Sequence, residues 1–164
     1  MQIVRSWGIL VVLLLSLICA FVSVPTASAT VVIPLTDEGL IEHAEGIVIG
    51  QVTRIESAWD PQTQRILTYI TIALEETLKG EFAVNELTIV QPGGSIGTFH
   101  SWRVGSPEFS LGERVLVFLR PDPQGRPRVA HLFQGKFSIA TDEASGDEIA
   151  HRALPRGVLH AGSS

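Results

Sequence analysis

The stretch Ile66–Leu78, with the sequence ILTYITIALEETL, has the clearest periodicity in the chain and decides the expected fold. Every second residue from Ile66 to Leu74 is apolar or threonine, and this period of two predicts a strand that packs one face against a core. At about 3.3 Å a residue such a strand would run for about 40 Å, whereas a compact domain of the expected size is about 36 Å across. We therefore expect a strand that bends or coils.

The segments around this strand also predict β structure, because each is rich in branched or aromatic apolar residues between turn-forming ones. The expected strands are Gly46–Glu56, Glu86–Gln91, Glu113–Leu119, Arg128–Phe133 and Lys136–Ala140. The third of these is apolar at both parities, which is typical of a central or enclosed strand. Five or six antiparallel strands, one of them strongly curved, predict a small Greek-key barrel of the OB type, with a β-sandwich as the alternative.

Turn-forming residues predict how these elements connect. Ser57–Arg65 contains an Asp-Pro pair, so the first two strands are expected to form an antiparallel hairpin with a long loop. Pro121–Pro127, with the sequence PDPQGRP, predicts a second turn. Upstream of the strands, Thr36–Glu45 predicts one short N-terminal helix that its threonine caps and Gly46 ends.

The N-terminal sequence has the three parts of a secretory signal peptide. Arg5 gives a basic start, Ile9–Val24 is an almost unbroken apolar run, and an A-x-A motif follows. The apolar run is shorter than the about 20 residues that a membrane-spanning helix needs. We expect residues 1–29 to be a signal peptide cleaved between Ala29 and Thr30, with an uncleaved anchor as the alternative. The protein would then be periplasmic or extracellular, with no membrane attachment after cleavage.

The remainder of the chain is expected to form one domain at residues 30–141, followed by a partly disordered tail at 142–164. Cleavage would remove Cys19, the sole cysteine, so the mature chain would hold no disulfide. It would also remove Arg5 from the 12 basic residues, leaving 11 against 17 acidic ones and a formal charge of −6. This acidic balance argues against nucleic acid or an anionic membrane as the partner.

The sequence contains no recognisable catalytic or metal-binding constellation. Gly93–Gly97 (GGSIG) matches the G-x-S-x-G nucleophile elbow, but the residues after it have no helical period. The five histidines are scattered, and no two have the i, i+4 spacing that places two metal ligands on one helix face. We therefore expect a protein that is not an enzyme and holds no metal and no cofactor. A small serine hydrolase that uses Ser95 is an alternative.

The long connection Pro92–Gly112 is the main candidate for function, because long ordered loops on β scaffolds often carry binding sites. Tryptophan and arginine are also enriched at interaction hot spots. The alternative is that Trp102 and Phe109 fold back as a lid over one end of the barrel. The candidate binding residues are Trp59, Phe99, His100, Trp102 and Arg103, and the expected partner is an exported protein or a glycan.

Several ordered motifs carry a resemblance to a known family. They are HAEGIVIGQV (43–52), SAWD (57–60), ITIALEETLKG (70–80), VQPGGSIG (90–97), VGSPEFSLGERVLVFL (104–119) and FQGKFSI (133–139). Together they resemble a family of small exported bacterial proteins, mostly uncharacterised, some of which carry this module ahead of a matrixin-like metalloprotease. The resemblance implies, as an alternative function, a regulator or inhibitor of an exported metalloprotease.

In architecture the expected domain is also loosely similar to the OB-like fold of netrin modules and tissue inhibitors of metalloproteases. Those inhibitors reach the catalytic zinc through an N-terminal cysteine. The expected mature chain has no cysteine, so the resemblance does not imply inhibition by that route.

Overall fold

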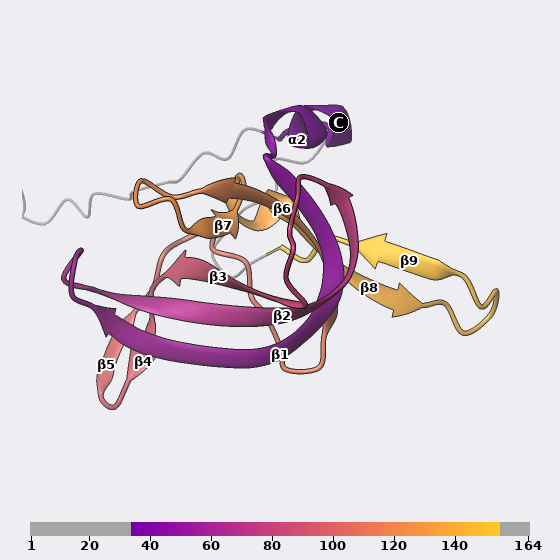
Figure 1. The fold of residues 1–164 in the computed structure, drawn as a ribbon. Coiled ribbons are helices and arrows are strands. Elements are labelled where there is room, and N and C mark those ends of the chain that lie inside the picture. The colour runs from indigo at the N-terminus through magenta and orange to yellow at the C-terminus, as the bar shows by residue number, and fades with distance from the viewer. Residues whose placement is uncertain (1–33, 155–164) are drawn as a thin grey trace, which may run out of the picture. The chain divides into compact units, whose positions relative to one another are not determined.

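The computed structural model describes residues 34–154, whose regular structure is mainly antiparallel β-sheet with one short α-helix (Figure 1). The prediction of a mainly β fold is therefore confirmed. In chain order the elements are α2 (Asp37–His43), β1 (Gly46–Asp60), β2 (Arg65–Lys79), β3 (Glu86–Pro92), β4 (Gly94–Ile96), β5 (Phe99–Ser101), β6 (Arg114–Pro121), β7 (Pro127–Val129), the 3-10 helix η1 (Leu132–Gly135), β8 (Lys136–Thr141) and β9 (Glu148–His151).

Seven strands form one sheet in the order β3-β2-β1-β6-β8-β9, and β7 pairs with β6. The two remaining strands, β4 and β5, form a separate hairpin. Within residues 34–154 no backbone ladder joins β3 to another strand besides β2, so the sheet is open rather than closed by hydrogen bonds. β3 nevertheless lies close to β7 across the gap.

The β1–β2 hairpin curves strongly, as the length of the second strand predicted (Figure 1). Three register shifts interrupt its ladder, all between Ile47 and Arg54 of β1. Such irregularities increase the local twist and bend the strand that carries them. The expected long loop is wrong, because pairing continues outward to Asp60 and Arg65 and leaves a turn of only four residues, 61–64.

Two apolar clusters occupy opposite faces of the sheet. The larger lies between β1, β2, β3 and β6, and the smaller lies beneath α2, where Leu40 is fully buried. Strand β6 contributes Val115 and Val117 to the first cluster and Phe118 to the second. This explains why its sequence is apolar at both parities. Members of the larger cluster are Val48, Val52, Ile70, Ile72, Leu87, Ile89, Val115, Val117 and Leu119.

The ends of several elements differ from the prediction. Thr36 caps α2 by accepting a hydrogen bond from the backbone N of Gly39 at 3.2 Å, but the helix ends at His43 because Ala44 is already extended. The strand expected at 128–133 is divided into β7 and η1. The expected tail contains β9, which pairs with β8 and carries Glu148, an ion-pair partner of Arg114.

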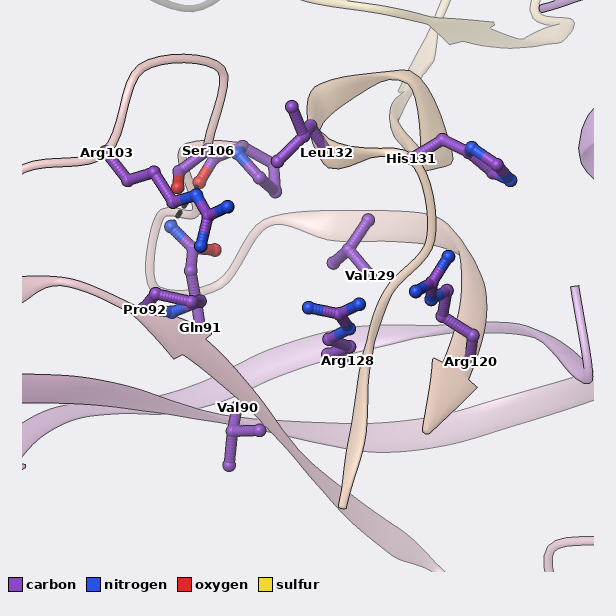
Figure 2. A pocket seen from close by; sticks show the side chains of 11 residues that line it. Val90, Gln91, Pro92, Arg103, Ser106, Arg120, Arg128, Val129, His131 and Leu132 are labelled. Atoms are coloured by element: carbon purple, nitrogen blue, oxygen red, sulfur yellow. Dashed lines mark hydrogen bonds between the residues drawn. The ribbon is translucent and has the colours of Figure 1, made fainter. Parts of the chain in front are cut away.

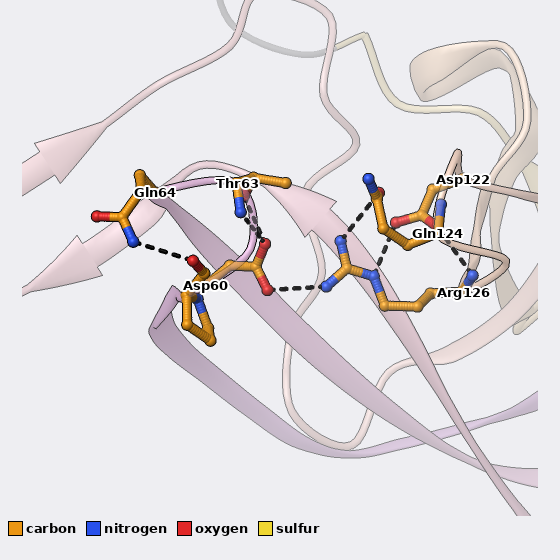
Figure 3. A network of polar contacts seen from close by, with 7 residues as sticks. Asp60, Thr63, Gln64, Asp122, Gln124 and Arg126 are labelled. Carbon is orange, nitrogen blue, oxygen red and sulfur yellow. Dashed lines mark hydrogen bonds and ion pairs between the residues drawn. The ribbon is translucent and has the colours of Figure 1, made fainter.

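Side chains from two distant turns form a network that we call the Asp60–Arg126 clamp (Figure 3). Arg126 Nη1 pairs with Asp60 Oδ1 at 3.0 Å, and its Nε pairs with Asp122 Oδ2 at 2.8 Å. Asp60 also accepts hydrogen bonds from Thr63 N at 3.0 Å and Thr63 Oγ1 at 2.5 Å. The clamp thereby ties the tip of the β1–β2 hairpin to the β6–β7 hairpin.

We expect Asp60→Asn to lower the thermal stability at neutral pH, because an amide cannot pair as an anion with Arg126. The hydrogen bond from Thr63 lowers the pKa of Asp60 below its ordinary value of 3.8, and Arg126 adds to this against the opposing effect of burial. Because the folded-state pKa is depressed, this stabilisation is present above the unfolded-state pKa and is lost as the pH falls through the folded one.

The measurement is the Tm of both proteins from neutral to strongly acid pH, where the two curves should converge. Asp147→Asn is the control, because the Asp147 side chain is exposed and makes no hydrogen bond or ion pair within the described residues. A Tm difference between Asp60→Asn and the wild type that stayed constant into acid would contradict the role of the charge.

Candidate functional site

The β4–β5 hairpin is fastened to the first hairpin by two hydroxyl side chains. Thr68 Oγ1 donates to the carbonyl oxygen of Gly93 at 2.8 Å, and Ser57 Oγ accepts from Ser95 N at 3.3 Å. Gly94 has a φ of +136°, and a Cβ there would lie 2.3 Å from Ser57 Oγ and 2.4 Å from Thr68 Oγ1. Only glycine fits this contact. The glycine-rich segment therefore forms the base of a hairpin, and no helix follows it as a nucleophile elbow requires.

Three of the predicted binding residues are large aromatics that remain exposed. The exposed fractions are 54% for Trp59, 62% for Phe99 and 59% for Trp102. Trp59 and Phe99 contact each other edge to face with their ring centroids 6.3 Å apart, a favourable aromatic geometry. Trp102 therefore does not fold back as a lid. Phe109, by contrast, packs against the larger core cluster, and its ring centroid lies 5.4 Å from Lys136 Nζ.

A groove of about 510 Å³ lies between the β4–β5 hairpin and the loop that follows it. Ile55 of β1 and Ile70 of β2 contribute apolar side chains to its lining. The structure brings His100, Trp102 and Arg103 together at this groove. The other two predicted residues, Phe99 of β5 and Trp59 near the end of β1, form the edge-to-face pair described above.

Ser95 and His100 face each other across the β4–β5 hairpin, with Ser95 Oγ 2.8 Å from His100 Nδ1. Both side chains are exposed. A Ser-His-Asp triad needs a carboxylate that orients the imidazole, and within residues 34–154 no aspartate hydrogen-bonds to His100. The described contacts are those of a surface hydrogen bond across a hairpin.

A smaller cavity of about 220 Å³ adjoins the groove, and we call it the arginine pocket (Figure 2). Arg103 of the loop, Arg120 of β6 and Arg128 of β7 line it, and Figure 2 shows their guanidinium groups around the hollow. Arg103 lines both the groove and the pocket. No sequence pattern singled out the other two, although a turn centred on Gln124 could have placed Arg120 opposite Arg128 by register.

Positive charge accumulates at this pocket. Burial lowers the pKa of Arg128, and the charges of Arg120 and Arg103 lower it further against the opposing effect of Asp122. Arg128 Nε is buried and has no hydrogen-bond partner among the described residues. The pKa of His131 is lowered as well, first by burial, but its ring turns away from the hollow in Figure 2.

A scan of the chain against protein-family models finds no match, and a search of the curated proteins finds none either. The resemblance to small exported bacterial proteins therefore stays a sequence-based prediction. The predicted signal peptide and its cleavage site lie outside the described residues.

Residues 34–154 contain neither a group of metal-ligating side chains nor a long apolar helix. In that part of the chain no three His, Cys, Asp or Glu side chains are grouped so as to hold a metal ion. Its one α-helix, α2, is also too short to cross a bilayer.

Proposed function

We propose that this chain is an exported, non-catalytic β module that binds a protein partner along the groove beside the β4–β5 hairpin. Trp102 would be the anchor of this contact, with Arg103 and His100 beside it. The curved sheet would act as a rigid, barrel-like scaffold whose strands are tied together by the Asp60–Arg126 clamp in place of a closing ladder. The proposal places the module in the periplasm or outside the cell.

The concentration of exposed apolar side chains in residues 99–111, the segment that contributes His100, Trp102 and Arg103 to the groove, carries this proposal. Of the ten large apolar side chains that are exposed in the described part, four lie between residues 99 and 111. They are Phe99, Trp102, Val104 and Leu111. Clusters of exposed apolar residues mark interaction sites, and interfaces are enriched in aromatic residues and arginine.

The composition of this surface favours a protein over a glycan. A sugar offers many hydroxyl groups, which need polar partners when they are desolvated. Val104 and Leu111 can make only apolar contacts, and they suit the apolar side chains of a peptide segment better than they suit a sugar. Arg103 adds a side chain that is common at protein interfaces.

We expect Trp102→Ala to weaken binding of the partner about 30-fold or more, because truncation of a hot-spot tryptophan costs about 2 kcal/mol or more. The wild type, Trp102→Ala and Ile41→Ala serve as immobilised baits for the exported proteins of the source cells. Ile41→Ala is the matched control, because it truncates an exposed apolar side chain on α2. A protein retained by the wild type and the control but not by Trp102→Ala is then purified, and its affinity for all three is measured.

Two results would overturn the proposal, given that both variants keep the wild-type Tm. In one, no retained protein depends on Trp102. In the other, a glycan array shows Trp102-dependent binding of a sugar while no protein is retained in that way. The second result would make the chain a glycan-binding module.

A further inference from the structure

We infer that the arginine pocket is a binding site for a small organic anion, a compact molecule that carries two negative charges as carboxylate or phosphate groups together with a hydroxyl group. This site adjoins the proposed protein contact, and the residues that line both are Gln91, Pro92, Arg103, Ser106 and Pro107.

The backbone register places two of the arginines directly against each other. Arg120 of β6 and Arg128 of β7 are opposite partners in the β6–β7 hairpin. Like charges directly opposite on paired strands are destabilising. Arg103, which lines the same pocket, adds a third positive charge from a different part of the chain, and its charge is the smallest contribution that lowers the pKa of Arg128. The repulsion between these arginines lowers the stability of the fold. An anion bound among their guanidinium groups would offset this repulsion.

Among the described residues, Glu108 aside, no carboxylate side chain forms an ion pair with these arginines. All 17 of its aspartate and glutamate residues lie within residues 34–154. In this part of the chain the ion pairs of the other carboxylates, Glu108 aside, are made with residues other than Arg103, Arg120 and Arg128. Asp122 acts on Arg128 only at longer range, since it pairs with Arg126 at 2.8 Å and accepts backbone hydrogen bonds in its own turn.

Two buried polar atoms at the pocket lack a partner among the described residues, and they indicate what the ligand carries. Arg128 Nε can donate to a carboxylate or phosphate oxygen, which guanidinium groups bind with a planar fork of N–H donors. Gln91 Nε2 donates to the carbonyl oxygen of Pro107 at 2.9 Å, which leaves Gln91 Oε1 buried and turned toward the hollow in Figure 2. That oxygen can accept a hydrogen bond from a ligand hydroxyl.

The size and walls of the pocket limit the ligand. The cavity of about 220 Å³ is smaller than the about 300 Å³ at which pockets for drug-sized ligands begin. Val90, Val129 and Leu132 give the wall apolar patches. The ligand is therefore compact, with a short carbon frame between its charged groups.

The test uses calorimetric titration of the whole protein with three probes: malate, inorganic phosphate and malamide. Malate carries two carboxylates and a hydroxyl, phosphate carries charge without a carbon frame, and malamide keeps the shape of malate without its charge. We expect saturable binding of malate in the millimolar range or tighter, weaker binding of phosphate and none of malamide. Arg128→Gln and Arg120→Gln should each weaken malate binding at least tenfold, whereas Arg54→Gln, a charge loss at an exposed position of β1, should leave it unchanged.

A second measurement separates binding from structural support. In anion-free buffer Arg128→Met should raise the Tm, because it removes a half-buried positive charge that lies opposite Arg120, and malate should no longer raise the Tm of this variant. Absence of saturable malate binding would overturn the inference, as would equal weakening by Arg54→Gln. A lower Tm for Arg128→Met together with unchanged malate affinity would show a purely structural arginine. None of these results depends on Trp102, so this inference and the proposed protein contact can fail independently.

Discussion

Replacing Ile72 by alanine is expected to lower the free energy of unfolding by about 2–5 kcal/mol, the range measured when a buried isoleucine or leucine is truncated. The Ile72 side chain has no exposed surface and belongs to the larger core cluster. It lies on β2 between Val52 of β1 and Leu87 of β3, so its loss leaves a cavity bounded by three strands. The packing around it cannot collapse without moving paired backbone, which places the expected cost in the upper half of the range.

Denaturant unfolding of the wild type, Ile72→Ala and Leu78→Ala checks this prediction. Leu78 is on the same strand but half of it is exposed, so its truncation should change the free energy of unfolding by about 0.5 kcal/mol or less. The slope of the unfolding free energy against denaturant should stay constant in all three proteins. Equal losses in the two variants would show that β2 does not pack as described.

The second large effect is expected from Glu113→Gln, which should lower the free energy of unfolding by about 3 kcal/mol, as removal of one partner from a buried ion pair does. Lys136 is 5% exposed, and its Nζ donates to Glu113 Oε1 and to Ser138 Oγ. Ser138 Oγ donates to the same carboxylate oxygen at 2.5 Å, and Ser110 N donates to its other oxygen at 3.0 Å. Loss of the carboxylate leaves a buried ammonium group without its counter-ion.

The same carboxylate makes stability depend on pH. Burial raises the pKa of Glu113, but the hydrogen bonds from Lys136, Ser138 and Ser110 outweigh it and hold the pKa below the ordinary value of 4.5. Because the folded-state pKa is the lower one, the stabilisation is complete above the unfolded-state pKa and is lost as the pH falls through the folded-state value. The stability difference between the wild type and Glu113→Gln should therefore shrink in acid.

Urea unfolding at neutral and acid pH measures this effect. Glu86→Gln, on an exposed position of β3, is the control and should match the wild type. The double variant Glu113→Gln with Lys136→Met should recover much of the loss, because it removes the unpaired charge as well. If the double variant is no more stable than Glu113→Gln, the loss of stability comes from the missing hydrogen bond between Ser110 N and the carboxylate, and not from the buried ammonium group.

Alternation and turn chemistry predict the strands whose side chains meet the core. Ile66–Leu78 and Glu113–Leu119 were located within two residues of β2 and β6 because their apolar residues pack on buried faces. Strand β9 was missed because all four of its residues are exposed, so no apolar pattern marks it. Its pairing with β8 and the ion pair between Glu148 and Arg114 hold it in place, and both are tertiary contacts.

The candidate site was likewise predicted only in part. The sequence singled out Trp102 and Arg103 because aromatic and basic residues in a long loop are visible without a structure. The arginine pocket was not predicted because it depends on the approach of β3 to β7, which no local pattern encodes. The expected closure of the barrel depended on the same approach. Side chains of the Asp60–Arg126 clamp hold the β1–β2 and β6–β7 hairpins together. Asp60 and Arg126 are 66 positions apart, and the sequence gives no signal that they pair.

The double pairing of β1 sets the order in which the molecule can assemble. Its ladder with β2 joins neighbouring segments and can form as soon as both strands are available. Its ladder with β6 joins distant segments, such as Gly46 and Leu119. Closing so long a loop costs conformational entropy before the new contacts can compensate for it. Val48 of β1 and Val115 and Val117 of β6 are fully buried in one cluster, so their complete burial needs the β1–β6 pairing. We therefore expect the docking of β6 onto the β1–β2 hairpin to be the rate-limiting step of folding, so variants in β6 should slow folding more than variants at the hairpin turn.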